Sequence, residues 1–159
     1  MRVYADTSFL VKLVSSEWEA EAARAEYRRL GMPRLFYLPL HALEVENAMR
    51  LRVFHLRKTL PSRERGHLAR EKLVSFSRVQ QRLDRGLLVE ISSDWDHAIT
   101  RARDLSAKHS ERIGTRSLDL LHVAFALELE SELFLTTDRQ QAELAKAEGL
   151  EVIALAEEE

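Results

Sequence analysis

Short apolar runs alternate along the chain with longer segments in which apolar residues recur every three or four positions. The runs are short enough for buried strands and fall at residues 2–5, 35–38, 87–91, 133–135 and 152–155. The periodic segments predict helices at about residues 8–14, 18–30, 39 to the break at 59–62, 62–83, 93–108, 118–127 and 139–147. This alternation predicts an α/β domain with three α/β/α layers and a mainly parallel central sheet.

Polar residues predict where several of these helices begin and end. Ser62 is a candidate N-cap for the long basic helix that follows it. Ser93, with Asp96 three residues further on, resembles a capping box. Residues 109–117 contain Gly114 and predict a polar loop. The helix from residue 118 is apolar on nearly every side, which is typical of a buried helix.

Composition narrows the class of protein. At 159 residues the chain is most simply one domain, predicted over residues 1–155, with an acidic tail at 156–159. It has no cysteine, which excludes disulfides, zinc–thiolate sites and thiol catalysis. No apolar run approaches the ~20 residues of a membrane helix. The apolar start is broken at Asp6, unlike a signal peptide, so we expect a cytoplasmic protein that does not enter a membrane.

Charge is distributed unevenly along the chain. Residues 50–85 carry eleven Lys and Arg against three acids, although the whole chain has a formal net charge of −2. A basic segment beside an acidic remainder fits a protein that grips a polyanion near a carboxylate centre. A solvated helical face is the other interpretation of such a charge run.

Four carboxylates lie where an apolar run gives way to a helix start: Asp6, Glu44, Asp119 and Asp138. The carboxyl ends of parallel strands share one edge of a sheet, where α/β folds bind ligands. Acids far apart in sequence would then lie close together, and a bound cation would be needed to offset their mutual repulsion. Hard oxygen ligands favour Mg²⁺ or Mn²⁺. Taken singly, each acid has a structural alternative, such as the capping of the helix that follows it.

Four motifs resemble those of PIN-domain nucleases, and of the VapC-type toxins of toxin–antitoxin pairs in particular. They are residues 3–10 (VYADTSFL), 43–49 (LEVENAM), 117–126 (SLDLLHVAFA) and 135–138 (LTTD). The resemblance covers essentially the whole chain, with the motifs in order and at ordinary spacing. It implies a metal-dependent endoribonuclease that hydrolyses RNA, forms a homodimer and is bound by a cognate antitoxin.

The resemblance also assigns roles to individual residues. Asp6, Glu44, Asp119 and Asp138 match the acidic quartet that binds one or two Mg²⁺ or Mn²⁺ ions. Residues two apart on a helix diverge by about 200°, so Glu44 and Glu46 cannot both face the site. We prefer Glu44 because it stands three residues before Asn47 and aligns with the glutamate of the motif that the segment resembles.

Other candidate residues come from position and charge. Thr7 and Thr137 each follow or precede a carboxylate and could orient a ligand or a water bound to the metal. Arg116 could hold a phosphate or an acidic side chain, or be a surface arginine. His122 lies on the face of Asp119, but a lone histidine in an apolar helix is more often a hydrogen-bonded core residue. The candidates for contacts to the RNA backbone are Arg50, Arg52, Arg57 and Lys58.

Two other classes of protein fit parts of this pattern. A phosphoryl-receiving protein of the response-regulator type would have paired acids after the first strand and a lysine after the last, but Asp6 has no acidic neighbour and residues 152–155 end without lysine. A protein of the haloacid-dehalogenase type would have a second Asp two residues after Asp6, where Ser8 stands. A non-catalytic PIN-like module that binds RNA or protein is the remaining alternative, and the presence of all four acids argues against it.

Overall fold

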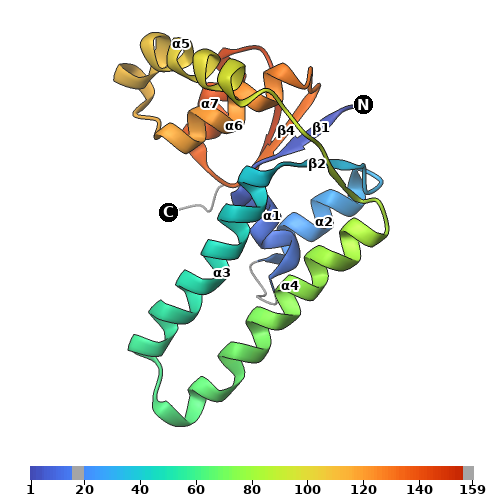
Figure 1. Ribbon diagram of the computed structural model, residues 1–159, viewed down its shortest axis with the longest axis vertical. Coiled ribbons are helices and arrows are strands. Elements are labelled where there is room, and N and C mark those ends of the chain that lie inside the picture. Colours follow the sequence, from blue (N-terminus) through green and yellow to red (C-terminus); the bar gives the residue numbers. More distant parts are fainter. Residues whose placement is uncertain (16–19, 156–159) are drawn as a thin grey trace. The chain divides into compact units, whose positions relative to one another are not determined.

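The strands and helices predicted from the apolar pattern are present in the computed structural model, which describes residues 1–15 and 20–155 (Figure 1). The described chain divides into two units. The first comprises Met1–Phe9 and Ile91–Glu159, and the second comprises Leu10–Glu90. The assignment of residues 1–155 to one domain stays a prediction. The predicted tail and the predicted start of the helix at 18–30 lie outside the described residues.

The first unit contains three parallel strands: β1 (Val3–Ala5), β4 (Leu133–Thr136) and β5 (Glu151–Ala154). β4 lies between the other two, because Leu133 is in register with Val3 on one side and with Glu151 on the other. All residues of β1 and β4 are buried, as their continuous apolar runs predict. The parallel pairing places the carboxyl ends of β1 and β4 side by side.

Three helices pack within this unit: α5 (Trp95–Ile113), α6 (Ser117–Glu128) and α7 (Arg139–Ala147). α5 packs along α6, and α7 packs against β4 and β5. α6 is buried on nearly every side, as its sequence predicts. Its Phe125 meets Trp95 edge to face, with ring centroids 5.0 Å apart. Asp119 is thereby fixed at the start of a helix that has almost no exposed face.

The second unit holds the following elements: α2 (Glu21–Arg29), β2 (Leu35–Tyr37), α3 (Pro39–Thr59), η2 (Ser62–His67), α4 (Leu68–Asp84) and β3 (Leu88–Glu90). α1 (Thr7–Val14) begins in the first unit and continues into the second. β2 and β3 pair in parallel. The two long helices, α3 and α4, pack against each other and run in opposite directions (Figure 1).

Two predicted helix starts are wrong. Ser62 does not cap the basic helix; it begins the 3₁₀ segment η2, and α4 starts at Leu68. Residues 62–67 offer no apolar side chain to bury, whereas Leu68 is the first buried residue of the segment. The N-cap of α5 is Asp94, not Ser93: its carboxylate accepts a hydrogen bond of 3.0 Å from the His97 N–H.

The predicted end of α5 is also wrong. The helix continues through half of the expected loop and stops at Ile113, which is buried. Gly114 then ends it with a left-handed backbone (φ 78°), a conformation that costs glycine little. The α/β class with parallel strands is confirmed. No helix in the described ranges is both long and apolar enough to cross a membrane.

Candidate acidic site of the first unit

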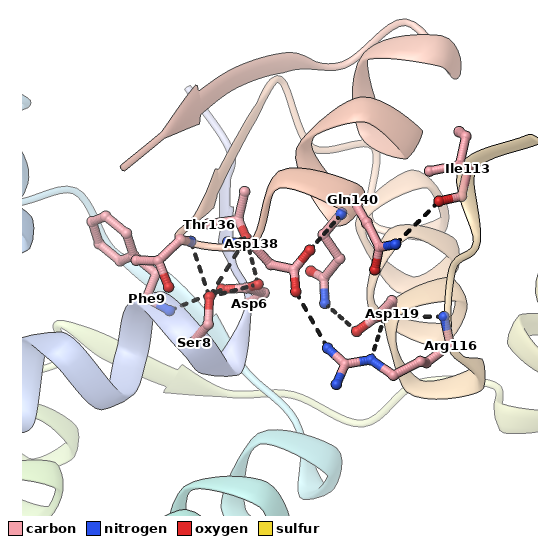
Figure 2. Close-up of polar contacts among 11 residues, drawn as sticks. Asp6, Ser8, Phe9, Ile113, Arg116, Asp119, Thr136, Asp138 and Gln140 are labelled. Carbon is pink, nitrogen blue, oxygen red and sulfur yellow. Dashed lines mark hydrogen bonds and ion pairs between the residues drawn. The ribbon is translucent and has the colours of Figure 1, made fainter. Parts of the chain in front are cut away.

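Asp6 follows β1 directly and is fully buried. The Phe9 N–H donates to its Oδ1 at 2.9 Å, so the carboxylate caps the first turn of α1. The Ser8 hydroxyl lies 2.7 Å from Oδ1 and 2.9 Å from Oδ2, and the Thr136 hydroxyl donates to Oδ2 at 2.6 Å (Figure 2). Burial raises the pKa of Asp6; the charge of His122 and the hydrogen bonds from Thr136, Phe9 and Ser8 oppose that rise.

The same two hydroxyls tie the loop after β4 to Asp6. The Asp138 N–H donates to Thr136 Oγ1, and the Thr137 N–H donates to Ser8 Oγ, each at 2.9 Å. Each hydroxyl therefore accepts a hydrogen bond from the backbone and donates one to Asp6 (Figure 2). The position of Asp138 is coupled to that of Asp6 through these bonds.

Asp119 lies in the first turn of α6 and is only 5% exposed. Its Oδ2 accepts from both the backbone N–H and Nε of Arg116, at 3.1 Å each. Its Oδ1 accepts from Nε2 of Gln141 at 2.9 Å. A carboxylate with so little solvent needs such donors, because an unpaired buried charge is costly.

Asp138 is the N-cap of α7 and is about one quarter exposed. Its Oδ1 accepts from the Gln141 N–H at 3.0 Å, and its Oδ2 accepts from Nη2 of Arg116 at 3.2 Å. Arg116 therefore spans Asp119 and Asp138, as Figure 2 shows. Three of the four predicted acids thus lie at one edge of the β1–β4 pair, linked by Thr136 and Arg116.

The fourth predicted acid, Glu44, lies on α3 in the second unit and is partly buried. Glu46 is exposed and pairs with Arg50 one helical turn away, at 2.8 Å. The choice of Glu44 over Glu46 stays a prediction.

The threonines of this site have different neighbours. The hydroxyl that reaches Asp6 after β4 is that of Thr136, while Thr137 contributes its backbone N–H to Ser8. Thr7 Oγ1 lies 3.2 Å from His122 Nε2, and Tyr4 OH lies 2.8 Å from His122 Nδ1. His122 is buried with both ring nitrogens engaged, which agrees with a hydrogen-bonded core residue.

Three residues of this site were missed by the sequence reasoning: Ser8, Thr136 and Gln141. A signal existed for Gln141, because it stands three residues after the N-cap Asp138, where a Glu or Gln side chain faces the cap. Gln141 is buried, and its Oε1 has no hydrogen-bond partner among the described residues. Thr136 and Ser8 carry no comparable signal, since a hydroxyl at a strand end or in a first helical turn is common.

The donor chemistry of this site fits a hard divalent cation. In the described ranges no three acidic or histidine side chains are already arranged as a metal-binding group. However, the three aspartates offer only oxygen, and the orphaned Oε1 of Gln141 adds a buried amide oxygen next to Asp119. Carboxylate and amide oxygens are the ligands that Mg²⁺ and Mn²⁺ accept.

Fold and site together define a class: parallel α/β proteins with acids at the carboxyl ends of neighbouring strands. Among solved structures, the crystal structure of PAE2754 from Pyrobaculum aerophilum is similar to this chain, with a TM-score of 0.53 and 16% sequence identity. The similarity covers 96% of this chain and 89% of that one. At this identity it shows a shared fold. No match was found among curated proteins.

The PIN domain family matches residues 3–147, and the chain belongs to this family. That range includes all four predicted acids. The three-layer α/β/α class predicted from the sequence is the class of the PIN fold. PIN domains are generally metal-dependent nucleases, so the chain has a nuclease-type fold.

Proposed function

We propose that this chain is a Mg²⁺- or Mn²⁺-dependent endoribonuclease that hydrolyses RNA phosphodiester bonds, and that it is the VapC-type toxin of a toxin–antitoxin pair. One observation carries the proposal: Asp6, Asp119 and Asp138 gather at one sheet edge in a chain of the PIN domain family. Several anions at one edge suit a site that holds cations and, through them, a phosphate.

The metal would be held by Asp6, Glu44, Asp119 and Asp138, with the amide oxygen of Gln141 as a further candidate ligand. The chemistry supplied by Mg²⁺ or Mn²⁺ when bound is the activation of water and the neutralisation of charge on the phosphate. Phosphoryl transfer depends mostly on positioning and electrostatics, so no protein nucleophile is needed.

Neighbouring side chains hold the carboxylates of this edge in position and balance their charge. Ser8 and Thr136 keep the Asp6 oxygens in place, and both are fixed in turn by backbone donors. The guanidinium of Arg116 balances the charge of Asp119 and Asp138 and is itself mostly exposed. It can therefore reach a substrate phosphate from the same position, while Thr7 and Thr137 would orient bound water.

The remaining parts of the proposal concern partners and location. The substrate is RNA, and its backbone would contact Arg50, Arg52, Arg57 and Lys58. A cognate antitoxin would block the acidic edge with a basic side chain, and the toxin would act as a homodimer in the cytoplasm. An antitoxin arginine facing buried carboxylates would form a strong charge-assisted hydrogen bond.

Glu44 and Glu46 give the first test. We expect Glu44→Gln to lower the cleavage rate at least about a hundredfold, as expected of a group that touches the metal. Glu46→Gln is the matched control, since Glu46 is exposed and paired with Arg50; its rate should change less than about threefold. Cleavage of a labelled RNA in Mg²⁺ measures both. The opposite ranking would assign the metal-facing role to Glu46.

Gln141 gives the second test, and its readout is stability. The substitution Gln141→Glu places a second carboxylate against buried Asp119, so we expect this variant to lose about 1–3 kcal/mol of unfolding free energy in EDTA. Mn²⁺ should restore much of that loss, because a cation between the two carboxylates removes their repulsion. Gln81→Glu adds the same charge at an exposed position of α4, where the Ser77 hydroxyl that now accepts from Gln81 can instead donate to the carboxylate, so this control should show neither effect. Equal melting shifts in the two variants would remove Gln141 from the site.

A non-catalytic PIN-like module that binds RNA or protein is the second candidate. Two observations favour it: Arg116 already pairs with two of the acids, and the described acids form no ready-made metal-binding group. Sequencing of cellular RNA ends after brief induction separates the two functions. New ends with the wild type and none with Asp6→Asn support the nuclease. Identical RNA ends in both cultures would support the binding module.

A further inference from the structure

The basic segment of the second unit contains cations with different surroundings. Arg78 and Arg82 donate to backbone carbonyls at the end of α1, and Arg65 donates to the Leu60 carbonyl. Arg63 pairs with Glu64. These side chains are engaged within the fold, so the excess charge of residues 50–85 is not one uniform surface.

A second group of cations faces a hollow between α3 and α4. The hollow has a volume of about 440 Å³ and is lined by Arg50, Val53, Phe54, Arg57, Lys58 and Lys72. None of these described lining residues is acidic. Five of the six residues lie on α3 at spacings of three, four, seven and eight residues, so they share one face of that helix. Lys72 completes the lining from α4.

Among the described residues, no acid forms an ion pair with Arg57, Lys58 or Lys72. Arg50, in contrast, pairs with Glu46. Positive charges collected around one hollow repel each other, and an anion entering it relieves that repulsion. Arg52 does not line this hollow; it lines a neighbouring cavity that contains Glu71 and shares Val53 and Lys72 with the hollow.

The hollow also contains an aromatic ring that folding leaves half exposed. Phe54 is 50% exposed, and the Lys58 ammonium lies 4.0 Å from its ring centroid. An anion that draws Lys58 away would uncover one face of the ring. Cations beside an exposed aromatic face are the two features that single-stranded nucleic acids need, since phosphates pair with cations and bases stack on rings.

We propose that this hollow binds one nucleotide unit of single-stranded RNA, with its phosphate on Arg57, Lys58 and Lys72 and its base on Phe54. The volume falls within the roughly 300–1,000 Å³ of pockets that hold small molecules. The proposal rests on the function proposed above for its choice of RNA. In this arrangement Phe54 and Lys72 contact the RNA in the hollow, and Arg52 does not.

Binding of a fluorescein-labelled twelve-nucleotide unstructured RNA to the full chain, in EDTA, tests the proposal without cleavage. Replacing Arg57, Lys58 and Lys72 together with Gln should weaken binding at least tenfold. The slope of log affinity against log salt should become shallower by about 0.7, the value for one phosphate contact with a single strand. Arg70→Gln is the control, because Arg70 is exposed on α4 but does not line the hollow. Equal affinity of the triple variant and the control would overturn the proposal.

Substitutions of Phe54 distinguish binding of a nucleic acid from binding of an acidic protein. Phe54→Leu should weaken RNA binding about five- to hundredfold with the salt slope unchanged, and Phe54→Tyr should preserve binding. An abasic strand should be insensitive to Phe54→Leu. If a polyglutamate peptide of equal charge competes as well as RNA and Phe54→Leu has no effect, the hollow binds an acidic partner and the proposal is wrong.

The outcomes also separate this proposal from the nuclease function. If RNA binds through the hollow but is not cleaved in Mg²⁺, the proposed nuclease function is wrong, and the proposal that the hollow binds RNA still holds. If the triple variant binds and cleaves RNA as well as the wild type does, the proposal that the hollow binds RNA is wrong, and the proposed nuclease function still holds.

Discussion

Asp6→Asn is expected to abolish RNA cleavage, lowering the rate at least about a hundredfold, while the protein remains folded. Loss of residues that merely support metal ligands costs about 10–100-fold, so loss of a ligand itself should cost at least the upper value. The amide is a neutral and weaker ligand. Because Asp6 is the most buried of the three gathered acids, no exposed side chain can readily take its place.

The fold should tolerate this change for reasons visible in its hydrogen bonds. The Asn oxygen keeps the Phe9 N–H that caps α1, and Asn caps helices about as well as Asp. The new amide N–H can donate to Thr136 Oγ1, whose own proton can turn to Ser8 Oγ, 3.5 Å away. Removing a buried charge also removes its desolvation cost. We therefore expect the free energy of unfolding in EDTA to change by no more than about 1–2 kcal/mol.

Two measurements decide the matter together: melting without metal, and growth inhibition when the chain is expressed without an antitoxin. Near-native melting with lost toxicity is the expected pair of results. A variant that melts normally and still cleaves RNA would leave Asp6 as a helix cap and end the nuclease mechanism.

The parts of the fold that the sequence predicted are those fixed by burial on all sides. β1, β4 and α6 are continuous apolar segments, and each is buried along nearly its whole length. Helix starts depended on competing caps: Asp94 and Ser93 are adjacent and both suited to the role. η2 shows the same limit, because Ser62 is a good cap but the next buried side chain comes only at Leu68.

The structure links three of the predicted acids, Asp6, Asp119 and Asp138, through neighbours that the sequence did not identify, and their role as metal ligands stays a prediction. The sequence favours Thr137 beside Asp138, yet Thr136 is the hydroxyl that reaches Asp6. That choice depends on how the chain turns after β4, which tertiary contacts with Ser8 decide. Likewise, Arg116 could pair with Asp119 by local spacing alone, but its bond to Asp138 requires the packing of α6 against α7.

Asp119→Asn should weaken Mn²⁺ binding at least tenfold without unfolding the protein. Asp119 Oδ1 now accepts from Gln141 Nε2, while Gln141 Oε1 has no partner among the described residues. In the variant, the Gln141 amide can rotate by half a turn, so that Oε1 accepts from the new Asn N–H. The hydrogen bond between the two side chains is then retained, and Nε2 takes the place of Oε1 as the amide atom without a partner among the described residues. Arg116 loses part of its charge partner but keeps its bond to Asp138.

We therefore expect Asp119→Asn to lower the affinity for Mn²⁺ without unfolding the protein. Titration calorimetry with Mn²⁺ measures the first, and melting in EDTA measures the second. Asp104→Asn is the matched control, since Asp104 is exposed on α5 and the substitution removes the same charge. If only net charge mattered, both variants would lose affinity equally. Because Asp119 is buried beside the orphaned amide oxygen of Gln141, we expect the loss to be confined to Asp119→Asn. Unchanged Mn²⁺ affinity in that variant would remove Asp119 from the metal site.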